Sequence, residues 1–390
     1  MKVSGDWIER PETQRVCRLL TAGRHRALFV GGCVRNALLG APVTDIDIAT
    51  DARPERVLEL AEAEGLKAVA TGADHGTVTV VAGGHPHEIT TFRRDVETFG
   101  RHAVVAFSDD IREDAARRDF TMNALYALPD GTVVDPLGVG LTDLEARHVR
   151  FVGDAETRIR EDYLRILRFF RFTAWYGDPD AGFDPAALAA IAETVEGLAE
   201  LSAERVGAEL KKLLAAPDPV NAVAVMARTG ALSQVLPGAT PLLLGPLVHA
   251  EETAGVPPDP VRRLAALGAG EAEGRALRLS KREMRQLSLL QSLMGSRSDP
   301  AELGYRHGAE TARDALLLQA AARGAPLPEG ALEEARTAAT QRFPVTARDL
   351  MPAYEGPALG DKLAELERRW IASGFRLTRE ELLAEATHRP

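Results

Sequence analysis

Cysteine is scarce in this chain of 390 residues, and long apolar runs are missing. The two cysteines, Cys17 and Cys33, share no zinc-type spacing with histidine, which argues against both a disulfide framework and a structural zinc. No uncharged apolar run of about 18 residues occurs, so a membrane is not an expected partner. The start of the chain, MKVSGDWIERPETQ, lacks the apolar stretch of a secretory signal. These absences predict a cytoplasmic protein.

Basic charge is also in short supply. The net charge of −10 argues against a protein that coats nucleic acid non-specifically, and DNA is not an expected partner. A local exception is segment 275–297, RALRLSKREMRQLSLLQSLMGSR, in which Arg and Lys outnumber the acidic residues. On a single helix, Arg278, Arg282 and Arg285 would share a face and could contact phosphates. A solvated helix face explains the same pattern equally well.

The first third of the chain alternates strand-like and helix-like patterns, with glycines between them. We expect one sheet with helices packed on it, ending near residue 148. Strands are predicted at RALFVGG (26–32), TDIDIAT (44–50), LKAVAT (66–71), GTVTVVAG (76–83) and HEITTF (87–92), and helices at CVRNALLG (33–40) and RPERVLELAEAEG (53–65).

From Glu161 onward the strand signal fades, and Ala, Leu, Glu and Arg dominate. Helix-start signals recur, such as the capping-box pair Thr378 and Glu381. The expected fold class is therefore α+β: a head with a small, mostly antiparallel or mixed sheet and its helices, followed by an all-α part.

Two aspartates stand inside the apolar segment TDIDIAT, where aspartate is normally depleted. In a strand, Asp45 and Asp47 would point to the same face, with α-carbons roughly 6.5 Å apart. That spacing would let both carboxylates reach a pair of cations about 3.5–4 Å apart, and hard oxygen ligands suit Mg²⁺. Glu88, in HEITTF, could add a third carboxylate. Taken alone, exposed acidic residues on an edge strand explain the pattern better.

The turn VGGCVRN lies just upstream of the aspartates. Its glycines, including Gly32, would let the backbone approach a ligand, and Arg35 would point from the first turn of the following helix. A phosphate-binding turn beside a carboxylate pair is more informative than either feature alone. Neither a Walker-type loop nor a full Gly-x-Gly-x-x-Gly is present, so an ATPase P-loop and a dinucleotide fold are not expected.

Two arginine-rich segments follow, ARRDFTMNALY and RIREDYLRILRFFRF. In the second, a continuous helix would place Asp162 and Arg165 on one face. Aspartate accepts and arginine donates, so the pair matches the amino donor and ring-nitrogen acceptor that cytosine and adenine both present. Guanine and uracil present a keto acceptor beside an N–H donor, so the Asp162 carboxylate would face an acceptor and the Arg165 guanidinium would face a donor. The alternative is an amphipathic helix with a surface salt bridge.

The ordered motifs LFVGGCVRNALLG, TDIDIAT, HEITTFRRD, EDAARRDFTMNALY, DPLGVGLTDL and RIREDYLRILRFFRF resemble the bacterial class II tRNA nucleotidyltransferases. These are the CCA-adding enzymes, which share their head with bacterial poly(A) polymerases. The resemblance is dense over about residues 27–215 and thinner beyond.

The resemblance implies a role for each matching residue and a set of ligands. The expected ligands are two Mg²⁺ ions, the substrates CTP and ATP, and the 3′ end of tRNA. Asp45 and Asp47 would be catalytic metal ligands, with Glu88 as the third catalytic carboxylate. Gly32, Arg35 and Arg118 would bind nucleotide phosphate or sugar in a pocket that Asn123 lines. Asp162 and Arg165 would read the base, and Arg168 and Arg171 would line the nucleotide site.

The resemblance also implies a division into a catalytic head at 1–148, a helical neck carrying the base-reading helix at 149–220, and a tRNA-binding body and tail at 221–390. Three positions depart from the family pattern. Asn36 stands where aspartate is usual, Phe99 where an acidic residue is common, and Ala347 where glycine is expected. The change at Asn36 would remove a local ion pair. No His-Asp phosphohydrolase signature appears, so no additional phosphatase activity is expected.

Three functions remain open at this point. A full CCA-adding enzyme is favoured because segment 93–107, the family's flexible loop, is intact. A poly(A) polymerase would typically carry a strongly basic C-terminal extension, which this chain lacks. An inactive RNA-binding relative is disfavoured because both the carboxylate pair and the Asp/Arg pair are present.

Overall fold

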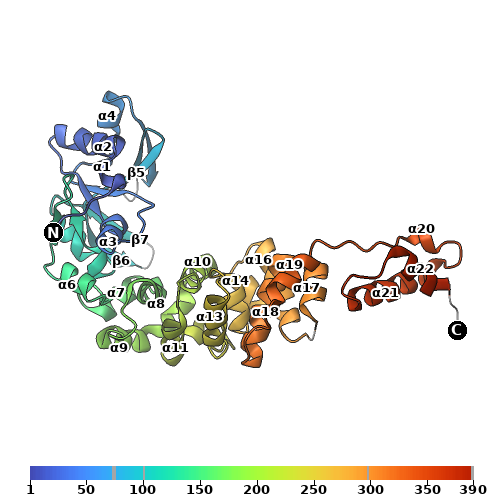
Figure 1. The fold of residues 1–390 in the computed structure, drawn as a ribbon. Helices are drawn as coiled ribbons and strands as arrows, with labels where there is room; N and C mark the ends of the chain where they lie inside the picture. Colours follow the sequence, from blue (N-terminus) through green and yellow to red (C-terminus); the bar gives the residue numbers. More distant parts are fainter. Residues whose placement is uncertain (73–75, 100–101, 297, 388–390) are drawn as a thin grey trace. The chain divides into compact units, whose positions relative to one another are not determined.

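The computed structural model describes residues 1–72, 76–99, 102–296 and 298–387 (Figure 1). Its contacts divide the chain into two compact units, Met1–Val235 and Leu236–Pro390. The predicted boundaries at 148 and 220 both fall inside the first unit, and the three-part division stays a prediction. Across the described ranges, no helix is both long and apolar enough to span a bilayer.

The first unit is built on a seven-stranded mixed sheet with the strand order β3-β4-β5-β2-β1-β8-β9. Among these strands, β2 and β5 pair in parallel and the other pairs are antiparallel, which confirms the predicted mixed sheet. The strands are β1 (Leu28–Val30), β2 (Asp47–Thr50), β3 (Lys67–Gly72), β4 (Thr77–Ala82), β5 (His85–Thr91), β8 (Tyr126–Ala127) and β9 (Val133–Val134).

Apolar residues alternate along strand β4 and give the sheet a buried face, against which helices pack. In β4, Val78, Val80 and Ala82 are buried while the residues between them are half-buried, as period-two alternation predicts. Helices α2 (Pro11–Ala22) and α4 (Pro54–Ala63) both pack against β4. The predicted helix at 53–65 is confirmed, with Pro54 in the first turn.

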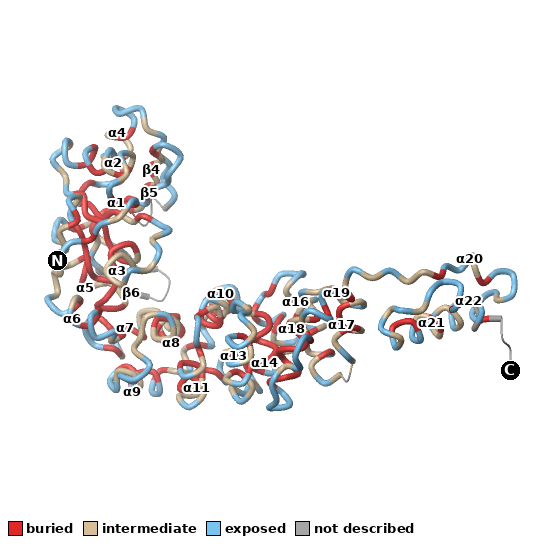
Figure 2. Tube along the Cα trace, viewed as in Figure 1, coloured by how far each residue is buried: buried red, intermediate tan, exposed pale blue. Residues whose placement is uncertain are grey.

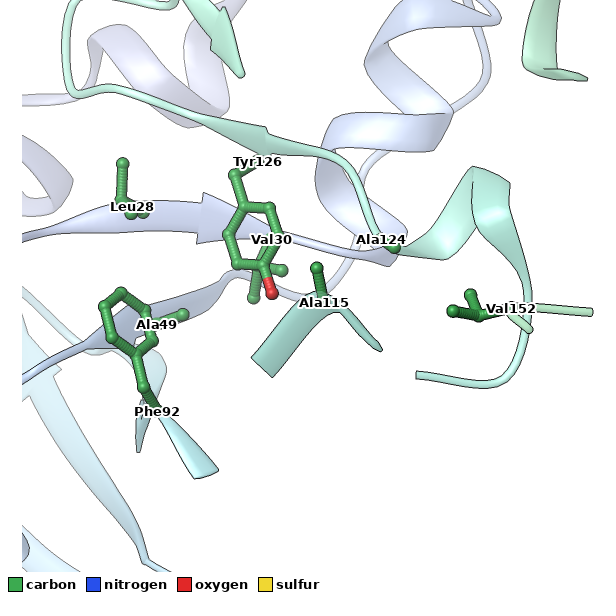
Figure 3. Close-up of a cluster of buried hydrophobic side chains, with 8 residues drawn as sticks. All are labelled: Leu28, Val30, Ala49, Phe92, Ala115, Ala124, Tyr126 and Val152. Carbon is green, nitrogen blue, oxygen red and sulfur yellow. The ribbon is translucent and has the colours of Figure 1, made fainter. Parts of the chain in front are cut away.

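A hydrophobic core lies where the central strands meet α5 (Ile111–Ala116) (Figure 3). Leu28 and Val30 of β1, Tyr126 of β8 and Ala115 of α5 belong to this core, and all four are at most 4% exposed. Figure 3 shows the Tyr126 hydroxyl directed toward the ribbon that carries Ala115. This core joins the sheet to the segment that carries the Arg-Arg-Asp motif.

Segment 93–107, expected to be a flexible loop, contains β6 (Arg93–Phe99) and β7 (His102–Phe107), which pair as a separate antiparallel sheet. Gly100 and Arg101 lie outside the described residues, and the structure does not describe the side chain at the departing position Phe99.

The rest of the first unit is helical. Four phenylalanines join this helical part to the sheet-bearing part: Phe120 contacts Phe151 and Phe172 with ring centroids 5.0 and 4.9 Å apart, and Phe151 stacks on Phe169 at 5.7 Å. The predicted head and neck therefore share an aromatic core.

The remaining helical elements of the first unit are α1 (Asp6–Glu9), α3 (Gly32–Leu38), η2 (Thr121–Asn123), α6 (Gly140–Glu145), α7 (Ala155–Glu161), α8 (Leu164–Tyr176), α9 (Pro185–Thr194), η3 (Val195–Glu200), α10 (Ala203–Leu214), α11 (Val220–Arg228) and α12 (Ala231–Val235).

The second unit is helical throughout its described residues, as predicted. Its central helix is α18 (Ala309–Arg323), which contacts α13, α14, α16, α17 and α19 and is buried along most of its length (Figure 2). The helices are α13 (Leu244–Thr253), α14 (Pro260–Ala266), α15 (Glu271–Ala276), α16 (Lys281–Met294), α17 (Pro300–His307), α19 (Ala331–Ala338), α20 (Ala347–Leu350), α21 (Gly356–Ala372) and α22 (Arg379–Thr387).

The basic segment 275–297 does not form the single helix that a shared arginine face requires. Helix α15 ends at Ala276, Arg278 adopts a positive φ of 54°, and α16 begins only at Lys281. The Ser280 side chain forms a capping box that starts the new helix. The predicted capping box at Thr378 and Glu381 is confirmed by reciprocal bonds.

Candidate active site

The carboxylates lie where β2 begins. Strand β2 starts at Asp47 rather than at residue 44, so Asp45 precedes the strand, and Thr44 donates a hydrogen bond of 3.1 Å to its side chain. Ile46 and Ile48 are buried and Asp45 is exposed. The predicted alternation is therefore correct, although the predicted strand is too long at its start.

Glu88 is the direct neighbour of Asp47 in the parallel register of β2 and β5. Asp47 is half-buried, and burial together with the charges of Glu88 and Asp45 raises its pKa to about 6, against an opposing effect of Arg118. The charges of the other two predicted carboxylates therefore both act on Asp47. Hard oxygen donors crowded in this way are stabilised by a divalent cation, so these residues fit Mg²⁺.

The described part of the chain holds no preformed cluster of three or more His, Cys, Asp or Glu side chains that could hold a metal. A cation at Asp47 would therefore take other ligands from water and from a bound phosphate, which is the habit of Mg²⁺ in phosphate-transfer sites.

The glycine turn connects β1 to α3 beside these carboxylates. Gly31 has φ +70°, a conformation that glycine adopts without strain. A Cβ atom at Gly31 would lie 3.5 Å from Nη1 of Arg118, so the guanidinium lies directly over this turn. Because Arg118 also lowers the pKa of Asp47, the turn, the arginine and the carboxylate form one site.

Arg35 of α3 is 6% exposed, and its hydrogen-bond partners in the described residues are neutral. It donates to the side-chain oxygens of Asn36 at 2.8 Å, of Tyr176 at 2.8 Å, and of Asn123, and its guanidinium lies 4.0 Å from the centre of the Tyr176 ring. Burial lowers the pKa of Arg35. Asn36 accepts from Arg35 as a neutral group, whereas an aspartate at this position would form an ion pair with it. A buried cation with neutral partners is suited to binding an anion.

Asn123 connects Arg35 to the arginine-rich helix. Its amide nitrogen donates to Asp119 at 3.0 Å, and Asp119 in turn accepts a hydrogen bond of 2.8 Å from Nε of Arg168 in α8. Burial raises the pKa of Asp119, but Arg168 and Asn123 outweigh it and lower the value to about 2. Arg171, one turn further along α8, pairs with the buried Glu209 of α10 at 3.1 Å. The predicted residues Arg35, Arg168 and Arg171 are therefore brought together, around Phe172.

The prediction of one continuous helix through Asp162 and Arg165 is wrong. Helix α7 ends at Glu161, Asp162 is extended, and α8 begins at Leu164. The cause is local: the Asp162 carboxylate accepts the Leu164 N–H at 3.1 Å, and such a side-chain bond competes with helix continuation.

The Asp162 and Arg165 side chains also have separate partners. Asp162 accepts a hydrogen bond of 2.6 Å from Arg205 of α10. Arg165 pairs with the Glu161 carboxylate and donates to the Arg158 carbonyl at 2.6 Å. The two side chains therefore lie at the same helix break without bonding to each other.

Sequence reasoning missed five side chains that hold these groups: Asp114, Tyr126, Tyr176, Arg205 and Glu209. Asp114 stands three and four residues before Arg117 and Arg118, a helical spacing that could have revealed it. Tyr126 lies eight residues after Arg118, beyond helical spacing, and the other three act across long sequence separations, so none of the four carries a local signal.

The family described as the Poly A polymerase head domain matches residues 27–150, and the family described as a probable RNA and SrmB-binding site of polymerase A matches residues 182–243. The fold and the site thus define a nucleotidyltransferase. The mouse mitochondrial CCA tRNA nucleotidyltransferase 1 is 34% identical over 94% of this chain and 87% of its own length. The chain therefore belongs to the CCA tRNA nucleotidyltransferases, as the motifs predict.

Two bacterial relatives agree with that assignment. The CCA-adding enzyme of Geobacillus thermodenitrificans is 43% identical over 57% of this chain and 54% of its own length. The crystal structure of the Bacillus stearothermophilus CCA-adding enzyme in complex with CTP is 29% identical, covers 96% of both chains and superposes with a TM-score of 0.74.

Proposed function

We propose that this protein adds C, C and A to the 3′ end of tRNA without a nucleic-acid template, using CTP and ATP and releasing pyrophosphate. The position of Arg118 over the Gly31 turn and beside Asp47 carries the proposal, because it joins a phosphate-binding cation to a carboxylate site. Family membership supports the same reaction. The cytoplasmic location and the exclusion of DNA stay predictions.

Asp45 and Asp47 would hold two Mg²⁺ ions, with Glu88 as the third catalytic carboxylate beside Asp47. Bound there, the ions would supply Lewis-acid stabilisation of the attacking 3′-hydroxyl and of the departing pyrophosphate oxygen. The protein's own contribution is positioning and charge. Arg118 and Arg35 would bind the triphosphate, and Gly32, together with Gly31, would let the phosphates approach the backbone. Arg168 and Arg171 add positive charge on the helical side of the pocket.

Asp162 and Arg165 remain the proposed readers of the base. Each Asp162 oxygen already accepts one hydrogen bond and has a further lone pair for the amino group of cytosine or adenine. Arg165 donates through Nη1 to Glu161 and to the Arg158 carbonyl, and its remaining N–H groups can serve the ring nitrogen. Asp162 is extended and Arg165 lies in the first turn of α8, so both side chains lie at the helix break, where a base could approach them together.

The second candidate is a poly(A) polymerase, since the matched head family carries that name. Incubating the protein with tRNA trimmed of its 3′ CCA and each nucleoside triphosphate distinguishes the candidates. Addition of C, C and A followed by arrest is the expected result. Long A tracts would support the polymerase, and no incorporation would support an inactive RNA-binding protein.

A pair of aspartate variants tests the carboxylate site in the same assay. Asp47→Asn should reduce incorporation by about a thousandfold or more while tRNA binding stays within twofold. Asp6→Asn, at an exposed aspartate in α1, is the matched control and should behave as wild type. Full activity of Asp47→Asn in Mg²⁺ would overturn the assignment of the metal ligands.

A further inference from the structure

The buried carboxylate of Asp114 in α5 has no place in the reaction described above. It is 1% exposed and accepts four hydrogen bonds. The donors are the Tyr126 hydroxyl at 2.7 Å, Arg118 Nη2 at 3.0 Å, Arg117 Nε at 3.0 Å and the Arg93 backbone N–H at 3.3 Å. A carboxylate so fully saturated is fixed in position.

Tyr126 holds the same arginine from a second side. It is fully buried, and its hydroxyl donates to Asp114 while accepting a hydrogen bond of 3.1 Å from Nε of Arg118. The Arg118 guanidinium also lies 5.3 Å from the centre of the Tyr126 ring. Burial lowers the pKa of Arg118, but Tyr126 and Asp114 outweigh burial, and the net direction is upward.

These contacts leave one end of Arg118 available to a ligand. An arginine has five N–H donors in a planar fork, and here Nε serves Tyr126 and Nη2 serves Asp114. The remaining nitrogen, Nη1, lies over the Gly31 turn. The side chain therefore runs from a buried anchor to the Gly31 turn, and it is 19% exposed.

We infer that Asp114 and Tyr126 are positioning residues that fix Arg118 over the Gly31 turn for contact with the triphosphate of the incoming nucleotide. The inference rests on the proposed function. A free arginine side chain would lose rotamer freedom when a ligand binds, and this clamp removes that cost beforehand. The hydroxyl of Tyr126 completes the clamp, because Arg118 Nε and Asp114 both bond to it.

Tyr126→Phe tests the inference, because it removes one hydroxyl and keeps the ring in the core. Thr13→Val is the matched control: Thr13 is also fully buried in the first unit, and its hydroxyl bonds to the buried His87 ring at 3.0 Å. Both variants should lower Tm by a similar amount, about 2–6 °C.

The nucleotide measurements should separate the two variants. Tyr126→Phe should raise KM for CTP and for ATP about five- to tenfold and leave the Kd for trimmed tRNA unchanged. Thr13→Val should change neither. Equal KM values in the two variants would overturn the inference, because Tyr126 would then contribute to stability alone.

Direct binding of ATP, measured without tRNA, keeps this inference separate from the proposed function. Weaker ATP binding by Tyr126→Phe supports the clamp even if the wild-type protein fails to add CCA. If the wild type adds CCA and Tyr126→Phe binds ATP as the wild type does, the clamp alone is wrong. Asp114→Asn is the second variant and should weaken ATP binding at least as much as Tyr126→Phe.

Discussion

Arg205 of α10 donates a hydrogen bond to Asp162 at the break between α7 and α8, with Nη2 2.6 Å from Oδ2. The other carboxylate oxygen of Asp162 accepts the Leu164 N–H at 3.1 Å. The Asp162 carboxylate, the proposed reader of the base, thus accepts one hydrogen bond from its own chain segment and one from a helix about forty residues further along the chain. Arg205 therefore fixes the direction in which Asp162 presents its free lone pairs.

Removing this support should loosen base selection. Arg205→Ala should lower the preference for C and A over U and G about five- to tenfold, because the Asp162 carboxylate then rotates more freely. Asp162→Ala should loosen or abolish the preference altogether. The measurement is the rate of incorporation of each nucleotide into trimmed tRNA.

An exposed ion pair elsewhere in the first unit supplies the control. Arg56 pairs with Glu59 at 2.9 Å on the exposed surface of α4, so Arg56→Ala should leave selection unchanged. Wild-type selectivity in Asp162→Ala would contradict the base-reading role itself. Wild-type selectivity in Arg205→Ala alone would show that Asp162 keeps its orientation without Arg205.

The close packing of the Tyr163 ring against Gly197 leads to a second prediction. A Cβ atom at Gly197 of η3 would lie only 2.1 Å from the Tyr163 ring, so Gly197→Ala must displace this ring and with it the adjacent Asp162. We expect a loss of about 1–3 kcal/mol in the free energy of unfolding, together with weaker base selection. Gly360→Ala is the control: its helix position has no neighbouring atom within 4 Å, so the protein should become more stable by about 0.5–1 kcal/mol. A Gly197→Ala protein with unchanged stability and selection would contradict the prediction.

Much of the sheet could be predicted because its signals are local. Alternation in β4 and the apolar run of β1 follow from which face of each strand is buried. The break at Asp162 could not be predicted from helical spacing, because a carboxylate that bonds to the next turn's backbone overrides the amphipathic pattern. The positive φ of Arg278 likewise interrupts a segment whose composition favours helix.

In the candidate site too, residue types could be predicted from local sequence, whereas contacts between distant segments could not. Asp47 and Glu88 were predicted as possible neighbours, and their register depends on β2 and β5 pairing in parallel across forty residues of chain. Some anchors of the arginines, such as Tyr176 for Arg35, depend on contacts between distant segments and could not be read from spacing. The sequence thus indicated the groups that would meet a ligand, and the structure adds those that hold them.

Acid should weaken the first unit through Asp114. Burial raises the pKa of this carboxyl, but Arg118 and Arg117 lower it to about 2 from an unperturbed 3.8. Because the folded state then binds a proton less readily than the unfolded state, the carboxylate contributes about 2–3 kcal/mol above pH 4, and this contribution is lost as the pH falls toward 2. In urea unfolding, the stability difference between wild type and Asp114→Asn should be constant from about pH 7 to 5 and should shrink below pH 4. Thr91→Val removes a buried hydroxyl that donates to the Ala52 backbone carbonyl at 2.6 Å, so it should differ from the wild type by the same amount throughout. A constant difference for Asp114→Asn would contradict the prediction.

A buried ion network should dominate the stability of the second unit. Glu251 of α13, 2% exposed, bonds to Arg262 at 2.8 Å and to Arg263 at 2.7 Å, and Arg262 continues to Asp314 of α18 at 2.7 Å. Glu251→Gln leaves two buried guanidinium groups short of a carboxylate, so the free energy of unfolding of this unit should fall by about 3–5 kcal/mol. The exposed pair of Arg275 and Glu271 in α15 is the control, and Glu271→Gln should change stability by less than about 0.5 kcal/mol. Amide hydrogen exchange in α13, α14 and α18 measures the free energy of opening for both variants, since these helices carry the network. Equal effects of the two substitutions would show that water reaches the network and screens it.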